Sequence, residues 1–77
     1  MKEFHINIRS FRQVQEFVSL AMVQPFDVWV CTESQQVNGK SFIGMLSLDS
    51  RQPVFVQVAC SEEEFCRFRN TVSQCLC

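Results

Sequence analysis

The sequence predicts an α+β fold with the element order βαββαβα, in which three helices cover one face of a four-stranded antiparallel sheet. Three segments alternate apolar and polar residues with a period of two, and a fourth strand follows one of them across a polar turn. Three other segments begin with a serine that can cap a helix and continue with apolar residues at helical spacing. Because each strand has one strongly apolar face, the helices should lie on that face and leave the other open. Residues 1–77 are expected to form a single domain.

The first strand and the first helix are predicted from residues 4–21. Apolar side chains alternate with polar ones in the strand, so His5 is expected on the open face of the sheet. Ser10 can then cap a helix, with Gln13 three residues later as in a capping box. The helix should end before Gln24-Pro25, since proline disfavours helical geometry in the residue before it. The expected core side chains are Phe4, Ile6, Ile8, Phe11, Val14, Phe17, Val18 and Ala21.

The middle of the chain predicts a hairpin and a short helix. A second strand is expected over Phe26–Thr32, followed by a polar turn and a third strand around Gln35–Asn38. Gly39 breaks the strand pattern, and Ser41 can cap a short helix that runs through Ser47. The second strand should place Phe26, Val28 and Val30 on one face and Asp27, Trp29 and Cys31 on the other.

The last third of the chain predicts one more strand and a long helix. Asp49–Pro53 forms a loop in this interpretation, and Val54–Cys60 forms the fourth strand. Ser61 with Glu64 repeats the capping box, and the acidic first turn complements the helix dipole. The apolar stripe of this helix consists of Phe65, Phe68, Val72 and Leu76.

Composition and charge argue against several classes of function. Seven basic and eight acidic residues are spread without a run, which disfavours a nucleic-acid or anionic-membrane surface. No signal peptide and no apolar run of the length of a membrane span is present, so a cytoplasmic location is expected. The odd count of five cysteines fits reduced thiols, and their spacing lacks the C-x-x-C doublets of a zinc site. Neither a metal nor another cofactor is expected. The cysteines are Cys31, Cys60, Cys66, Cys75 and Cys77.

The segment VNGKSFIGMLSL, residues 37–48, resembles the stretch around the regulatory serine of HPr. HPr is the phosphocarrier of the bacterial phosphoenolpyruvate-dependent sugar phosphotransferase system, and its pattern there is close to VN-x-KS-I-x-G-x-x-SL. The Lys40-Ser41 pair, Gly44 and the Ser47-Leu48 pair all fall in register with it. The element order predicted above is also that of the family, so the resemblance covers essentially the whole chain and implies an HPr-like open-faced sandwich.

The resemblance fails at the place where HPr carries its phosphate. The family's phosphorylated histidine stands at the N-terminus of the first helix, in a GIHARPA-like motif. The corresponding segment here, residues 9–14, places Ser10 at or next to the histidine position, and Arg12 is the expected match for the family's arginine. His5 lies five residues before Ser10 and within a strand, so it lacks the setting that phosphoryl transfer needs. The chain is therefore not expected to be an enzyme or a histidine phosphocarrier.

Two interpretations stand for each remaining candidate residue. Ser41 can be only a helix cap, or it can match the serine that HPr kinase phosphorylates. Phe42, Ile43 and Leu46 match the apolar residues with which HPr docks its partners, but they can equally pack in the core.

The open sheet face carries a third such ambiguity. Trp29 and Phe55, expected as cross-strand neighbours there, can form a dimer or ligand surface or only a stabilising aromatic pair.

These observations favour a regulatory, protein-binding member of the HPr family, similar to the catabolite-repression type of HPr. Its expected partners are HPr kinase or a transcription regulator, and a homodimer is possible. The alternatives are an interaction or oligomerisation module on an HPr fold unrelated to sugar transport, and a phosphocarrier with an unusual acceptor.

Overall fold

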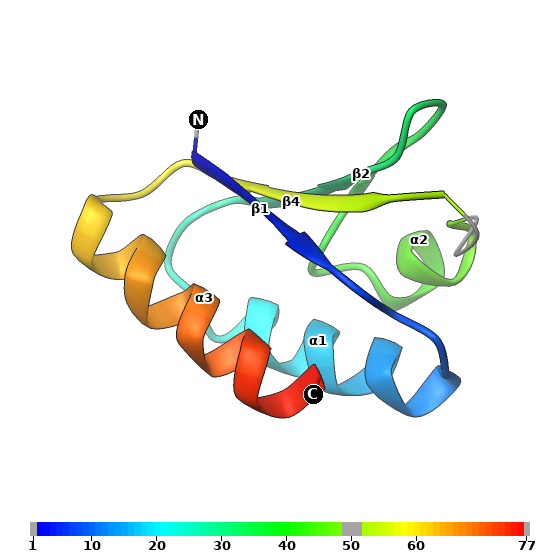
Figure 1. Cartoon of the computed structure of the whole chain (residues 1–77), viewed down its shortest axis with the longest axis horizontal. Coiled ribbons are helices and arrows are strands. Elements are labelled where there is room, and N and C mark those ends of the chain that lie inside the picture. The colour runs from blue at the N-terminus through cyan, green and yellow to red at the C-terminus, as the bar shows by residue number, and fades with distance from the viewer. Residues whose placement is uncertain (1, 49–51, 77) are drawn as a thin grey trace.

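The computed structural model describes residues 2–48 and 52–76, and the predicted order βαββαβα is confirmed. Four strands form one antiparallel sheet in the order β1-β4-β2-β3, so β1 and β3 lie at its edges. All three helices lie on the same side of the sheet (Figure 1). The strands are β1 Lys2–Ile6, β2 Val28–Cys31, β3 Gln36–Asn38 and β4 Val54–Val58, and the helices are α1 Phe11–Met22, α2 Phe42–Leu46 and α3 Glu62–Leu76.

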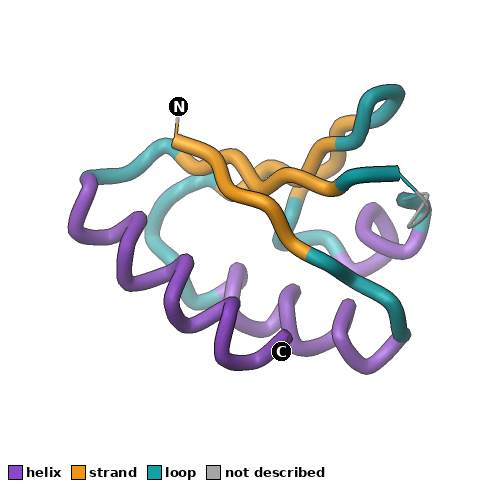
Figure 2. Tube along the Cα trace, in the orientation of Figure 1, coloured by secondary structure: helices purple, strands orange, loops and turns teal. Residues whose placement is uncertain are grey.

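The core lies between the sheet and the two long helices, α1 and α3, which run side by side beneath it (Figure 2). It is built from alternate positions of the strands and from the apolar stripes of the helices, as the period-two and helical patterns require. Phe17 and Phe68 are its largest fully buried side chains. Phe68 also packs edge-on against Phe26, with ring centroids 5.8 Å apart. The valines of the sheet that complete this centre are Val28, Val30, Val56 and Val58.

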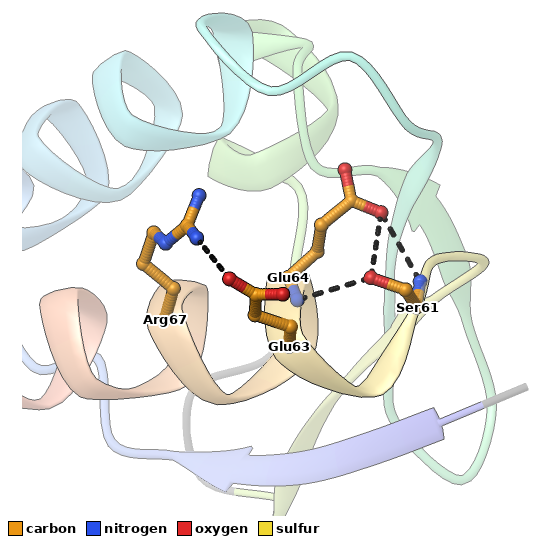
Figure 3. A network of polar contacts seen from close by, with 4 residues as sticks. All are labelled: Ser61, Glu63, Glu64 and Arg67. Atoms are coloured by element: carbon orange, nitrogen blue, oxygen red, sulfur yellow. Dashed lines mark hydrogen bonds and ion pairs between the residues drawn. The ribbon is translucent and has the colours of Figure 1, made fainter.

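Two of the predicted helix starts are confirmed in detail. At α3, the Glu64 N–H donates to Ser61 Oγ at 3.2 Å, and Glu64 Oε1 accepts from the Ser61 N–H at 3.1 Å (Figure 3). At α1, Ser10 Oγ accepts from the Gln13 N–H at 3.3 Å, but the Gln13 carboxamide accepts from the Arg9 N–H at 2.6 Å. The second half of that capping box therefore closes one residue earlier than in the usual motif.

Strand ends differ from the predicted ones by one or two residues. The predicted strands Phe26–Thr32, Gln35–Asn38 and Val54–Cys60 shorten to β2, β3 and β4. Residues 49–51 of the predicted loop, and Cys77, lie outside the described residues. In the ranges that the structure describes, no helix is long and apolar enough to cross a membrane.

The predicted burial of Phe11 and the predicted pairing of Trp29 with Phe55 are wrong, although Trp29 and Phe55 do lie on the open face. Phe11 is 57% exposed, because it lies in the first turn of α1 and meets α2 instead of the core. Trp29 and Phe55 are not opposed across β2 and β4, since Trp29 pairs with Gln57 and Phe55 pairs with Cys31. The aromatic contact of Phe55 is with His5 on the other neighbouring strand.

Gly39 joins β3 to α2 at a point where the backbone lies directly on the core. Its N–H donates to the Val28 carbonyl at 2.8 Å. A β-carbon at this position would lie 2.7 Å from Cγ1 of Val28 and 3.2 Å from Cγ2 of Val30. The absence of a side chain therefore allows the segment that leads to α2 to pack against the sheet.

Candidate functional site

The N-terminus of α1 presents a serine hydroxyl where the sequence predicts a degenerate phosphorylation site. Ser10 is exposed, has extended backbone geometry with φ −143° and ψ 158°, and uses its hydroxyl to cap the helix. Arg12 Nε donates to Glu16 Oε1 at 3.2 Å, and its side chain is 86% exposed. Such an exposed pair between residues one helical turn apart contributes little to stability. Neither Ser10 nor Arg12 needs a bound group to complete its contacts.

Ser41 begins α2 and also acts as a cap. Its Oγ accepts from the Gly44 N–H at 3.2 Å, and the residue is half-buried. Lys40, the residue before it, donates from Nζ to the Gln24 carbonyl at 2.9 Å. This bond ties the start of α2 to the chain that leaves α1, so the Lys40-Ser41 pair has a structural role independent of any modification.

The short helix α2 buries only one of its apolar side chains completely. Met45 is 2% exposed and joins the core, whereas Ile43 is 76% exposed and Leu46 is 45% exposed. Phe42 is half-buried and packs edge-on against Phe11, with ring centroids 5.3 Å apart. We refer to Phe11, Phe42, Ile43 and Leu46 as the α1–α2 patch.

A hollow of about 260 Å³ adjoins the α1–α2 patch. Ser10 and Phe11 line it from α1, Leu46 lines it from α2, and Met45 and Val14 contribute to its apolar wall. The structure therefore brings Ser10, from the region predicted to be a degenerate active site, and the predicted docking residue Leu46 to one surface. The lining of this hollow is mostly apolar, with Arg9 and Ser10 as the polar members.

The comparisons agree on the fold. No family model and no curated protein matches the sequence. Among solved structures, the HPr-C-His protein of Thermoanaerobacter tengcongensis superposes with a TM-score of 0.75 at 24% identity, over 99% of this chain and 96% of that one. The phosphocarrier protein HPr of Bacillus anthracis gives a TM-score of 0.73 at 16% identity, over 99% of this chain and 96% of that one. The chain has the HPr fold.

A third solved structure with this fold is the catabolite repression protein Crh of Bacillus subtilis. It superposes with a TM-score of 0.64 at 21% identity, over 100% of this chain and 99% of that one. The Crh structure is an intertwined dimer with a swapping domain. The HPr-like architecture predicted from residues 37–48 and from the element order is thus confirmed across the whole chain.

The HPr fold makes the position of the one histidine informative. His5 lies in β1 and is exposed on the open face, where its ring lies 4.3 Å from the ring of Phe55. The beginning of α1 instead carries Ser10, Phe11 and Arg12. The imidazole is therefore not part of the surface formed by α1 and α2.

Phe11 is the residue of this HPr-fold surface that sequence reasoning missed. Its spacing from Val14 and Val18 is that of the core stripe, and this spacing assigned it to the interior. The available signal was its place directly after the Ser10 cap, since only the elements that reach the first turn of a helix can bury a side chain there. In this fold α2 reaches it, and α2 is too short to cover the ring fully.

The thiols do not extend the site. Cys31 and Cys60 are half-buried, whereas Cys66 and Cys75 are exposed on α3. Desolvation, assisted by the negative charge of Glu3, raises the pKa of the Cys31 thiol. Desolvation also raises the pKa of Cys60, with a smaller contribution from Glu64 and an opposing one from Lys2. Among residues 2–48 and 52–76, no group of three or more His, Cys, Asp or Glu side chains is arranged to hold a metal ion.

Proposed function

We propose that this chain is a regulatory member of the HPr family, acting as a single domain that binds protein partners and does not carry phosphate on a histidine. The observation that carries the proposal is the exposed α1–α2 patch beside Ser10. Ile43 and Leu46 project apolar side chains at 76% and 45% exposure from a helix whose core contact is made by Met45. Clustered apolar side chains at a protein surface usually mark an interface.

The proposed function does not include histidine phosphotransfer, because no histidine stands at the start of α1 to accept the phosphoryl group. Phosphoryl transfer to a protein depends on a nucleophile positioned beside groups that stabilise the phosphate charge. The region that would supply it holds the Ser10 hydroxyl, which caps α1, and the Arg12 guanidinium, which pairs with Glu16. His5 lies on the open sheet face against Phe55.

Ser41 is the proposed regulatory position. HPr kinase would transfer the γ-phosphoryl group of ATP to Ser41 Oγ, with release of ADP and of the hydroxyl proton. The phosphate oxygens could accept the Gly44 N–H that Ser41 Oγ accepts now at 3.2 Å. Because Ser41 directly precedes Phe42 and Ile43, the added charge would stand at the border of the α1–α2 patch and alter which partner binds there.

The test of the regulatory site is incubation with HPr kinase and ATP, followed by intact-mass measurement. The expected result is one added phosphate on the unaltered chain and none on the Ser41→Ala variant. Ser10→Ala is the matched control, since it also removes a helix-capping hydroxyl but should keep the phosphate. An unmodified mass for the unaltered chain would contradict regulation at Ser41.

The test of the docking surface uses purified HPr kinase and the HPr-dependent transcription regulator as probes in calorimetric titrations. Ile43→Ala should weaken binding by about tenfold or more if Ile43 fills a desolvated contact. Met22→Ala removes a side chain of similar exposure, 63%, at the other end of α1, and should leave binding unchanged. Equal binding by both variants would place the interface elsewhere.

Homodimerisation is the second candidate, supported by the half-buried Trp29 and Phe55 on the open sheet face and by the dimeric Crh structure. If the chain associates through that face, it would be an oligomerisation module unrelated to sugar transport. Sedimentation should then give a dimer that Trp29→Ala dissociates. A monomer at all concentrations would remove this alternative.

A further inference from the structure

A second hollow, of about 290 Å³, lies where β1 leaves the sheet and β4 enters it. It shares Ile8, Arg9 and Val54 with the hollow beside the α1–α2 patch, but its other lining residues are more polar. Its polar lining comes from His5 of β1, from Asn7 and Arg9 of the connection to α1, and from Gln52 before β4. The inference drawn from it does not depend on the proposed function.

The hollow exists because the ladder between the two strands stops. The last pair of β1 and β4 joins Ile6 to Val54. The residue before Val54 is Pro53, which has no amide hydrogen and so cannot donate to a continued ladder. Beyond this pair the two chains no longer need to stay at hydrogen-bonding distance, and both line the hollow.

The polar side chains reach the hollow through a continued alternation. Ile6 and Ile8 are buried, whereas His5, Asn7 and Arg9 are exposed, and all three exposed residues line the hollow. A fourth side chain joins them from the other strand. Gln52 Oε1 accepts from Ser34 Oγ at 3.3 Å, an arrangement that leaves the Gln52 amide group as a donor.

All four side chains offer hydrogen-bond donors that lack an acceptor in the described part of the chain. Asn7 and Arg9 make no side-chain hydrogen bond or ion pair with residues 2–48 or 52–76, and the described residues that line the hollow include no Asp or Glu. The nearest carboxylate on the same strand face, Glu3, accepts from Gln57 Nε2 at 3.2 Å. The hollow therefore combines a permanent positive charge with unpaired donors.

The position of the imidazole is fixed by packing. His5 packs against Phe55 with the ring centroids 4.3 Å apart and the rings tilted by 58°. A ring held in this way loses less conformational freedom when it donates to a ligand. His5, Asn7 and Arg9 on one segment and Gln52 on the other are thus arranged around a space that an acceptor-rich group can enter.

We propose that this hollow binds a small phosphate-type oxyanion, either inorganic phosphate or a phosphate monoester. A guanidinium donates to phosphate in a two-pronged geometry, and phosphate oxygens offer more acceptor positions than a carboxylate. With two donors from Arg9 and one from each of His5, Asn7 and Gln52, the hollow offers more donors than the roughly four lone-pair sites of a carboxylate can accept. The remaining volume, bordered by Pro53, leaves room for the organic part of a monoester.

The experiment is an NMR titration of the full chain with inorganic phosphate, sulfate and acetate, each at an ionic strength held constant with sodium chloride. We expect saturable shifts with phosphate and sulfate at the signals of His5, Asn7, Arg9 and Gln52. Arg9→Gln should weaken both affinities by about tenfold or more, since it removes a charged donor but keeps the backbone N–H that Gln13 accepts. Arg67→Gln, a change on α3 outside the hollow, should leave them unaltered.

Three outcomes would overturn the proposal. Shifts that do not saturate would indicate only general ionic screening. Shifts that Arg9→Gln and Arg67→Gln weaken equally would indicate the same. Acetate binding as tight as phosphate binding would assign the hollow to carboxylates instead.

Asn7→Ala provides a second variant in case Arg9→Gln fails to fold, and it too should weaken phosphate binding. A methyl phosphate titration distinguishes a monoester site, which binds it at least as tightly, from one restricted to inorganic phosphate.

Discussion

His5 of β1 and Phe55 of β4 are directly opposed, and the centroids of their rings lie 4.3 Å apart. Both side chains belong to the open face of the sheet, and the contact joins an edge strand to a central one. The pair explains two features together. It holds the one histidine of the sequence, His5, against the sheet, and it gives Phe55 an aromatic partner other than Trp29.

This pair predicts a measurable coupling energy. Replacing His5 by Ala and Phe55 by Ala, singly and together, should give a double-mutant cycle with an interaction of about 0.5 kcal/mol, within the range for cross-strand pairs. Urea denaturation of the four proteins measures it. Strictly additive losses in the free energy of unfolding would show that the ring contact does not stabilise the sheet.

The two glycines predict opposite effects of the same substitution. Gly39→Ala should destabilise the fold by about 1–3 kcal/mol, because the new β-carbon would lie 2.7 Å from Val28 Cγ1 in the core. Gly44→Ala is the matched control, since its β-carbon would lie 3.4 Å from Ser41 Oγ, an ordinary contact, within helix α2. It should gain about 0.5–1 kcal/mol from the helix propensity of alanine. Thermal unfolding of both variants checks the contrast.

Helix α2 separates core from surface within three residues. Met45→Ala should cost about 2–5 kcal/mol, as truncations of buried side chains do. Ile43→Ala should change the free energy of unfolding by less than about 0.5 kcal/mol, since the side chain is 76% exposed. Denaturant titrations compare the two. A large loss for Ile43→Ala would mean that the α1–α2 patch stabilises the fold instead of serving a partner.

The fold was predictable because its signals are local and repeated. Strand alternation in β1, β2 and β4 and the caps Ser10, Ser41 and Ser61 each specify an element by themselves. The pairing of the strands is not local, and for this reason the sequence suggested Trp29 as the neighbour of Phe55 where the register places Gln57 opposite Trp29.

The candidate site was predictable only in part. The helical spacing predicts Phe11 in the core and gives no signal for Met45, whereas the structure exposes Phe11 and buries Met45. Which side of a five-residue helix is buried depends on where its neighbours stop, and no periodicity within α2 encodes that. The hollow at His5, Asn7 and Arg9 likewise depends on where β4 begins, because Gln52 completes it from another part of the chain.

Incubation with phosphoenolpyruvate, enzyme I and the chain should leave its mass unchanged. The α1 end of the surface formed by α1 and α2 carries the capping hydroxyl of Ser10, and the one histidine of the sequence, His5, lies on the open sheet face. An authentic HPr in the same reaction serves as the positive control for the enzyme. An acid-labile phosphate on this chain would contradict the proposed function and support a phosphocarrier with an unusual acceptor.

The half-buried thiols predict a dependence of stability on alkaline pH. Burial, with Glu3 as the second cause, raises the pKa of Cys31 above its value in the unfolded chain. The unfolded chain therefore ionises first as the pH rises, so the contribution of this thiol to stability is complete below the unfolded pKa and declines as the pH rises from there through the folded pKa. Between about pH 8 and pH 10, across the usual range of thiol ionisation, the urea midpoint of Cys31→Ala should fall less than that of the unaltered chain.

Alkylation by iodoacetamide, read peptide by peptide, should likewise label Cys31 and Cys60 more slowly at about pH 8 than the same residues in urea, because only the thiolate reacts. Equal labelling rates in the folded and unfolded chain would show that burial does not protect these thiols.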